Sequence, residues 1–359
     1  MEVSLMKNWK KLMAFGASTL LLAACGNKSA DKKDGDKSAS GDDSFKIAMV
    51  TDMGGVDDRS FNQSAWEGMN EWAKENNFSE KAVKYYQSDE ESQYVTNFNQ
   101  AVSDGWDIIY GIGFLLADPI EEVAKQNPDQ HFGIVDGTVD LPNVVSLNFK
   151  DHEAAFLAGV AAAMTTEKDH VGFIGGITGP IIDRFQTGFE AGVKYVNPDI
   201  KVDVQYAESF SDSGIGQQIA SAMYKNGADV VLHAAGAVGN GVFTEARNRM
   251  EAEPDKKIWV IGVDRDQEAE GKYEGGNLTL ASTLKLVGQA VKEASNSAIK
   301  GKFQGGENVV LGLADGGVDL TRGQMSEEAW KKVEEAKEKI ISGEIEVPEF
   351  TYTKVEKDK

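Results

Sequence analysis

Three aspartates, two adjacent glycines and the aromatic ring of Phe61 are gathered at the start of the stretch "VTDMGGVDDRSFNQSAWEG", residues 50–68. This stretch lies between an apolar run and a segment of helical periodicity. A carboxylate accepts hydrogen bonds from hydroxyl or ring N–H donors, and an aromatic ring offers a stacking face. Adjacent glycines let a loop fold sharply without a Cβ penalty. We therefore expect a strand-to-helix loop that carries Asp52, Asp57, Asp58, Phe61 and Asn62, of which all but Asp57 are candidate ligand contacts.

Two of these residues also have a purely structural interpretation. An aspartate before a helix often caps the first backbone N–H groups, which would occupy the carboxylate of Asp58. A phenylalanine at a helix start can pack as a hydrophobic staple, which would occupy Phe61. The sequence leaves both alternatives open.

The segments around this loop alternate between apolar runs and helical patterns. Near-continuous apolar strands separated by amphipathic helices indicate parallel strands that are buried on both faces, which is a doubly wound α/β plan. The predicted strands are "KIAMV", "DIIYGIG", "HFGIVD", "VVSLNF", "HVGFIGG", "DVVLHAA", "IWVIGVD" and "NLTLAST", and the clearest helical segments are residues 63–75, 93–103, 154–164 and 289–299.

An internal repeat indicates two lobes of this kind. The segment that begins at Ile47 can be laid over the segment that begins at Val171, which puts Phe61 on Phe185. The strand ends at Asp136 and Asp264 also correspond. Ligands of open parallel sheets bind beyond the carboxyl ends of the strands. Two facing lobes would therefore share one cleft, into which we expect both carboxylates and Phe185 to point, although Phe185 could equally be a core residue.

The N-terminal residues predict export and lipidation. Lysines precede an apolar stretch, residues 12–24, which ends in "LAAC". This pattern is typical of a bacterial lipoprotein signal peptide, residues 1–24, with lipidation at Cys25, although translation could start at Met6. An ordinary secretory signal with an incidental cysteine is the alternative. Residues 25–44 are polar and predict a flexible tether, so the protein would be anchored to the outer face of a cell membrane.

Charge and residue spacing exclude several classes of function. The formal net charge is -21, and the basic stripe expected of a nucleic-acid-binding protein is missing. His131, His152, His170 and His233 have no metal-ligand spacing, and no catalytic triad can be assembled. Cys25 is the only cysteine, so no intramolecular disulfide can form. We therefore expect no catalytic residue, metal or cofactor.

Several motifs resemble those of the basic membrane protein family, the purine-nucleoside receptor lipoproteins of ABC transporters. The resemblance covers essentially the whole mature chain and rests, besides the lipobox, on "DDRSFNQSAWEG", "HEAAFLAGVAA", "GFIGG", "FQTGFEAGV", "SFSDSGIGQ", "HAAGAVGNGVF", "VIGVDRDQ" and "STLK".

This resemblance implies the type I periplasmic-binding-protein fold, with two Rossmann-like lobes and three hinge crossings. The first lobe would comprise residues 45–149 and about 283–316, and the second residues 150–282 and about 317–359. The crossings would lie near residues 148–151, 280–284 and 315–319.

The resemblance also implies a binding site. Phe61 and Phe210 would sandwich a purine ring, and Asp136 would bind the base edge. Asp264 and Lys285 would meet at the ribose hydroxyls, close to the turn at Gly236 and Gly239. Asp52 and Asn62 are further cleft contacts.

The sequence thus predicts a monomeric, lipid-anchored receptor that captures nucleosides and delivers them to an ABC permease. Two alternatives remain. The first is a calcium-dependent nucleoside hydrolase, because the aspartates of "DMGGVDD" are spaced like those in the calcium loop of these enzymes. A sugar-binding receptor would share the expected fold.

Overall fold

The computed structural model describes residues 44–253 and 255–349. The chain divides into a unit of residues 1–39 and a unit of residues 40–359, and all described residues belong to the second. The predicted signal peptide, the lipidation at Cys25 and nearly all of the predicted tether lie outside the described residues.

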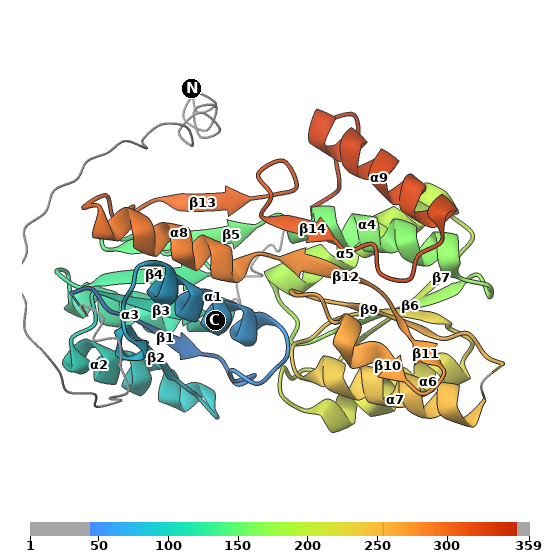
Figure 1. Ribbon diagram of the computed structural model, residues 1–359, viewed down its shortest axis with the longest axis horizontal. Coiled ribbons are helices and arrows are strands. Elements are labelled where there is room, and N and C mark those ends of the chain that lie inside the picture. Colours follow the sequence, from blue (N-terminus) through green and yellow to red (C-terminus); the bar gives the residue numbers. More distant parts are fainter. Residues whose placement is uncertain (1–43, 254, 350–359) are drawn as a thin grey trace, which may run out of the picture. The chain divides into compact units, whose positions relative to one another are not determined.

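The first lobe is built on a six-stranded sheet in the order β13-β5-β4-β3-β1-β2, in which all neighbours are parallel (Figure 1). Helices α1 and α8 pack together on one face, while α2 and α3 pack together on the other. The bounds are β1 Ile47–Thr51, β2 Val83–Tyr86, β3 Ile108–Ile112, β4 His131–Val135, β5 Val144–Phe149, β13 Asn308–Leu311, α1 Phe61–Glu75, α2 Tyr94–Asp104, α3 Ala117–Gln126 and α8 Val287–Ile299.

The second lobe repeats this plan with the sheet order β14-β12-β9-β8-β6-β7, in which only β14 is antiparallel to its neighbour. Helices α4, α5 and α9 cover one face, and α6 and α7 cover the other. A hairpin of β10 and β11 extends from it. The bounds are β6 His170–Gly175, β7 Lys201–Tyr206, β8 Val230–Ala234, β9 Trp259–Gly262, β10 Lys272–Tyr273, β11 Gly276–Asn277, β12 Thr279–Lys285, β14 Val318–Leu320, α4 Asp151–Thr165, α5 Pro180–Val196, α6 Ser213–Lys225, α7 Val238–Ala252 and α9 Glu327–Ser342.

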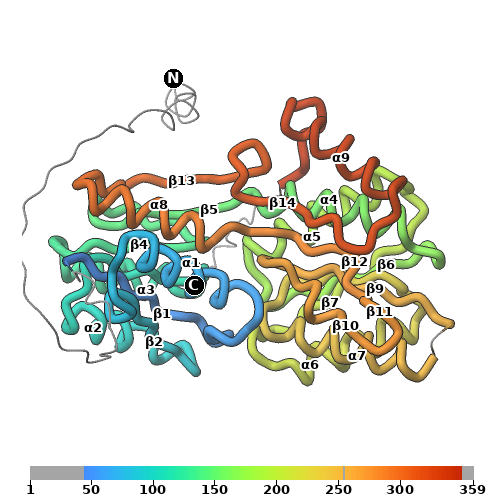
Figure 2. The backbone as a smooth tube through the Cα atoms, viewed as in Figure 1, coloured from blue at the N-terminus to red at the C-terminus, as the bar shows by residue number. Residues whose placement is uncertain are grey.

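The central strands follow the prediction because they are buried on both faces. All residues of β1, β3, β5, β6 and β8 are buried. The edge strands β2 and β7 were not predicted, since their solvent-facing residues interrupt the apolar run. Strands β13 and β14 were also missed, and Figure 2 shows β13 lying beside β5 although the two are far apart in the sequence.

Glycines bring α5 close to α4. A Cβ atom on Gly192 would lie 2.0 Å from the carbonyl oxygen of Phe156, and one on Gly188 would lie 2.3 Å from that of His152. Such distances are far below van der Waals contact, so the two backbones can approach only because both positions lack a side chain. This packing sets the position of α5, which carries Phe185.

The chain passes between the lobes three times, which confirms the predicted architecture. The crossings lie at Lys150, between β5 and α4, at Leu286, between β12 and α8, and at residues 312–317, between β13 and β14. The second crossing comes later than the expected residues 280–284, because β12 remains paired with β14 as far as Lys285. Among the described helices, none has the length and apolarity needed to cross a membrane.

Candidate functional site

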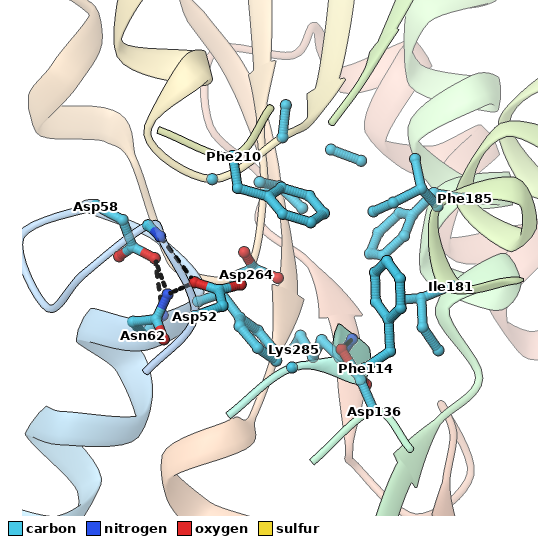
Figure 3. Close-up of a pocket in the computed structure, with 18 residues that line it drawn as sticks. Asp52, Asp58, Asn62, Phe114, Asp136, Ile181, Phe185, Phe210, Asp264 and Lys285 are labelled. Carbon is cyan, nitrogen blue, oxygen red and sulfur yellow. Dashed lines mark hydrogen bonds and ion pairs between the residues drawn. The ribbon is translucent and has the colours of Figure 1, made fainter. Parts of the chain in front are cut away.

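A cavity lies between the two lobes, beyond the carboxyl ends of their central strands (Figure 3). It contains about 500 Å³ of space free of protein atoms, some of it open to solvent. The first lobe contributes Asp52, Gly54, Asp58, Phe61, Asn62, Gly113, Phe114 and Asp136, and the second contributes Ile181, Ile182, Phe185, Phe210, Ala234, Ala235, Gly236, Val263, Asp264 and Lys285.

Asp58 caps helix α1, as the structural alternative proposed. Its carboxylate accepts hydrogen bonds from the backbone N–H groups of Ser60 (2.8 Å), Asn62 (2.8 Å) and Gln63 (3.1 Å). These groups have no partner within the helix, so the cap stabilises its first turn. Asp58 also lines the cavity, but most of its acceptor capacity is used by the helix.

Asn62 links Asp58 to Asp52. Its side-chain amide donates to Asp52 Oδ1 (2.8 Å) and to Asp58 Oδ2 (3.1 Å), as Figure 3 shows. Its own Oδ1 atom is buried and has no hydrogen-bond partner. A buried acceptor without a partner costs about 1–3 kcal/mol. Such an atom beside a cavity is explained if a ligand donates to it.

Asp136 and Asp264 end equivalent strands and face the same cavity, as the repeat predicted. Asp136 Oδ1 is a second buried acceptor without a hydrogen-bond partner. Burial raises the pKa of Asp136 to about 6 and the pKa of Asp264 to about 7. Burial likewise raises the pKa of Asp52 to about 6. Most buried polar side chains of the cavity are carboxyls or carboxamides, and two of their oxygens, Asn62 Oδ1 and Asp136 Oδ1, have no hydrogen-bond partner.

Lys285 does not meet Asp264 as expected. Its ammonium group forms ion pairs with Asp136 and with Asp151, the latter at 2.9 Å from Oδ1. Burial acts to lower the pKa of Lys285, but Asp136 and Asp151 outweigh this effect and raise it. The expected pair does not form because the two side chains have other partners. The ammonium group of Lys285 is directed to Asp136 and Asp151, whereas the carboxylate of Asp264 accepts a hydrogen bond from Ser60.

The aromatic rings of the cavity come from both lobes. Phe61 and Phe210 both line it, and so does Phe185, which is also packed in the core at 3% exposure. Phe185 is therefore both a cavity residue and a core residue. The ammonium group of Lys285 lies 5.1 Å from the centroid of the Phe61 ring and 5.7 Å from that of Phe185, within cation–π range.

Phe114 is a cavity residue that the sequence analysis missed. It follows β3 on the first lobe, and its ring meets Phe210 of the second lobe edge to face, with centroids 6.1 Å apart. Figure 3 shows the Phe114, Phe185 and Phe210 rings around the same space. The available signal was its place directly after the predicted strand "DIIYGIG", where a cleft-facing loop had to begin.

The two glycines of the expected turn have different positions. Gly236 lines the cavity, and its φ of +56° is in the region that favours glycine. Gly239 is not among the cavity residues. A Cβ atom there would lie 2.1 Å from the ring of His233, so Gly239 leaves room for that buried histidine instead.

A metal site is not evident in the described part of the chain, where no group of His, Cys, Asp or Glu side chains is arranged to hold a metal ion. Asp52 and Asp58 are instead engaged with backbone N–H groups and with Asn62, and Asp57 is exposed and does not line the cavity. The local geometry thus favours recognition of hydrogen-bond donors.

Comparisons with known proteins agree with this geometry. A family model described as "ABC transporter substrate-binding protein PnrA-like" matches residues 45–351. The "CD4+ T-cell-stimulating antigen" of Listeria innocua is 50% identical over 343 residues, 93% of this chain and 96% of the relative. The "ABC transporter nucleoside-binding protein BmpA" of Lactococcus lactis subsp. cremoris is 47% identical over 341 residues, 92% and 96% respectively.

The solved structures point to the same family. An ABC transporter solute-binding protein from Aeropyrum pernix K1 superposes with a TM-score of 0.75 at 28% identity, and the match covers 85% of this chain and 94% of that one. Because the family model spans nearly all described residues and the relatives are matched over almost their full length, the chain belongs to the Bmp family of PnrA-like ABC transporter substrate-binding proteins, with the type I periplasmic-binding-protein fold.

Proposed function

We propose that this protein captures nucleosides, purine nucleosides above all, in the cavity between its lobes and delivers them to an ABC permease. One observation carries the proposal: aromatic rings from both lobes surround a space whose buried polar groups are mostly acceptors. A nucleoside is complementary to this arrangement, because it combines a flat ring that carries N–H donors with a sugar that carries hydroxyl donors.

Each part of the ligand has its partner in this proposal. Phe61 and Phe210 stack on the base, and Phe114 packs against Phe210 in a T-shaped pair. Asp136, which keeps one oxygen without a hydrogen-bond partner, accepts from the base edge. Asp264 accepts from the ribose hydroxyls. Lys285 provides the positive charge that holds Asp136 in place.

Charge favours nucleosides over nucleotides. Four carboxylates line the cavity, and its single lysine is already engaged by Asp136 and Asp151. A phosphate group would bring further negative charge next to buried carboxylates that no additional cation in the lining balances. The Lactococcus relative, whose name describes it as nucleoside-binding, supports the same ligand class.

The proposed setting is the outer face of a cell membrane, where the protein acts as a monomer. This part rests on the N-terminal sequence, which combines an apolar signal, Cys25 and a polar tether. Several acyl chains hold a protein firmly at a membrane, whereas one short chain does so only marginally. Cys25→Ser is therefore expected to release the protein into the medium.

The test is to identify the small molecule that co-purifies with the protein. Mass spectrometry after denaturation is expected to detect a nucleoside, and the recovery of a hexose would support the sugar-receptor alternative instead. The nucleoside hydrolase alternative is set aside, because the family consists of substrate-binding proteins. Incubation with inosine and calcium should accordingly release no free base.

A further inference from the structure

Ser60 occupies the N-cap position of helix α1, but its side chain does not cap the helix. A serine at this position normally accepts a hydrogen bond from a backbone N–H group of the first turn. Here Asp58 has taken over that role, since its carboxylate accepts from the N–H groups of Ser60, Asn62 and Gln63. The hydroxyl of Ser60 is thereby free for another partner.

That partner lies on the other lobe. Ser60 Oγ donates a hydrogen bond to Oδ2 of Asp264, 204 positions along the chain, and both residues are buried. The bond joins the strand-to-helix loop of the first lobe to a strand end of the second. Ser60 is fully buried, so the bond is shielded from competing water.

Neighbouring contacts hold Ser60 in this position. The carbonyl oxygen of Arg59 accepts a hydrogen bond from Gln267 Nε2 (2.9 Å), and the Arg59 guanidinium pairs with Glu270. Gln267 is itself tied to the strand end before Asp264, because its Oε1 atom accepts from the N–H group of Val263 (2.9 Å). The loop and the carboxylate therefore meet in a defined geometry.

We propose that Ser60 is a positioning residue for the ligand's hydroxyl groups, which makes their recognition by Asp264 depend on contact between the lobes. This inference rests on the proposed function. A carboxylate has two oxygens that can accept up to about four hydrogen bonds. The bond from Ser60 to Oδ2 sets the orientation of the carboxylate and leaves Oδ1 to accept from the ligand.

The physical consequence is a difference between the open and closed forms. With the lobes apart, Asp264 loses Ser60 and its carboxylate is solvated and free to rotate. With the lobes together, the carboxylate is oriented before the ligand's hydroxyls reach it. Only a ligand that binds one form better can shift the equilibrium between them. A hydroxyl that finds a prepared acceptor only in the closed form provides such a difference.

The test compares Ser60→Ala with Ser326→Ala. Ser326 is the matched control, because it is the N-cap of α9 and its hydroxyl accepts from the N–H group of Ala329 (3.1 Å) in the ordinary way. Calorimetry would measure the binding of guanosine and 2′-deoxyguanosine to both variants, to Asp264→Ala and to the Ser60→Ala/Asp264→Ala double variant. Thermal unfolding would report on the fold.

Ser60→Ala is expected to weaken guanosine binding about tenfold, as for the loss of a charge-assisted hydrogen bond, and to weaken deoxyguanosine binding less. The difference in affinity between guanosine and 2′-deoxyguanosine would therefore become smaller. In the Asp264→Ala background the same substitution should add no further change. Ser326→Ala should lower the unfolding midpoint and leave both affinities unaltered.

Three results would overturn the inference. Ser60→Ala could bind both ligands as the unsubstituted protein does. It could weaken both by the same factor, which would make Ser60 a general contact between the lobes. It could also weaken guanosine binding as much in the Asp264→Ala background as in the unsubstituted protein. If the unsubstituted protein binds neither nucleoside, the proposed function fails and this inference fails with it, which is distinguishable from all three.

Discussion

Asp136 and Asp264 occupy equivalent positions in the two lobes. Each follows a central strand, and each has a positive φ, 63° and 68° respectively. A residue other than glycine rarely adopts this conformation, and it costs of order 1–3 kcal/mol. Both carboxylates line one cavity. The shared backbone conformation is thus a second respect, besides the position in the sheet, in which the two residues correspond.

The first prediction concerns the ribose. If Asp264 accepts from the ribose hydroxyls, loss of the 2′-hydroxyl should weaken binding by roughly tenfold or more, since a hydrogen bond to a charged group contributes about 1.5–3 kcal/mol. In Asp264→Ala the gap between guanosine and 2′-deoxyguanosine should shrink. Calorimetry with both ligands measures it. A variant that loses stability but keeps the whole gap would show that Asp264 is structural.

The second prediction concerns pH. Burial raises the pKa of Asp264 to about 7, whereas donors from a ligand would favour its ionised form. Binding should therefore release protons near neutral pH, and affinity should rise on the order of tenfold from about pH 6 to about pH 8. Titrations in buffers of different ionisation enthalpy measure the release. An Asp264→Asn variant with an unchanged pH profile would contradict this assignment.

The ligand-free protein should show the opposite trend. Asp264 binds its proton more tightly in the folded protein than in the unfolded chain. Its contribution to the free energy of unfolding is therefore greatest at low pH and is lost as the pH rises from about 4 through about 7. The same direction holds for Asp52, whose pKa burial raises to about 6. Urea unfolding of Asp264→Asn should reveal a weaker loss of stability over this range than in the unsubstituted protein.

The third prediction concerns stacking. A base stacked on an aromatic side chain contributes about 1–3 kcal/mol, so Phe210→Ala should weaken nucleoside binding roughly 5- to 150-fold. Phe303→Ala is the control, because the Phe303 ring stacks on His131, with centroids 4.0 Å apart, and does not line the cavity. Equal effects of the two substitutions on affinity would count against stacking on Phe210.

The fourth prediction compares two lysines that each pair with two carboxylates. Lys285 is 2% exposed and pairs with buried Asp136 and Asp151, whereas Lys292 pairs with the exposed Glu71 and Glu75. Lys285→Met leaves two carboxylates buried without this cation and should cost about 3–5 kcal/mol of unfolding free energy. Lys292 is itself only 8% exposed, but its loss leaves two exposed carboxylates in water, so Lys292→Met should cost about 0–1 kcal/mol. Urea unfolding measures both, and similar losses would refute the argument.

The sequence predicted the elements whose signal is local. Central parallel strands are apolar throughout, so their runs and their repeat indicated two lobes and located Asp136 and Asp264 at strand ends. Edge strands β2 and β7 escaped because exposed residues interrupt their pattern. Strands of this kind are recognised only through their pairing partners.

Contacts between distant residues could not be predicted in this way. The bond from Ser60 to Asp264 spans 204 positions, and the Phe114 ring meets Phe210 only when the two lobes face each other. Lys285 was correctly expected beside the cavity, but its partner depends on the direction of its side chain. The spacing of residues in the sequence indicates which side chains lie at which edge of a sheet. The packing of the folded chain determines which neighbour each of them contacts.

The central claim is that the cavity between the lobes binds a nucleoside. The most direct test is calorimetric titration of guanosine into the protein, stripped of any co-purified ligand, and into its Phe210→Ala variant. The account predicts saturable binding of one guanosine per chain, weakened in the variant. It would be contradicted if guanosine, inosine and adenosine all failed to bind, or if binding were unaffected by the loss of the Phe210 ring.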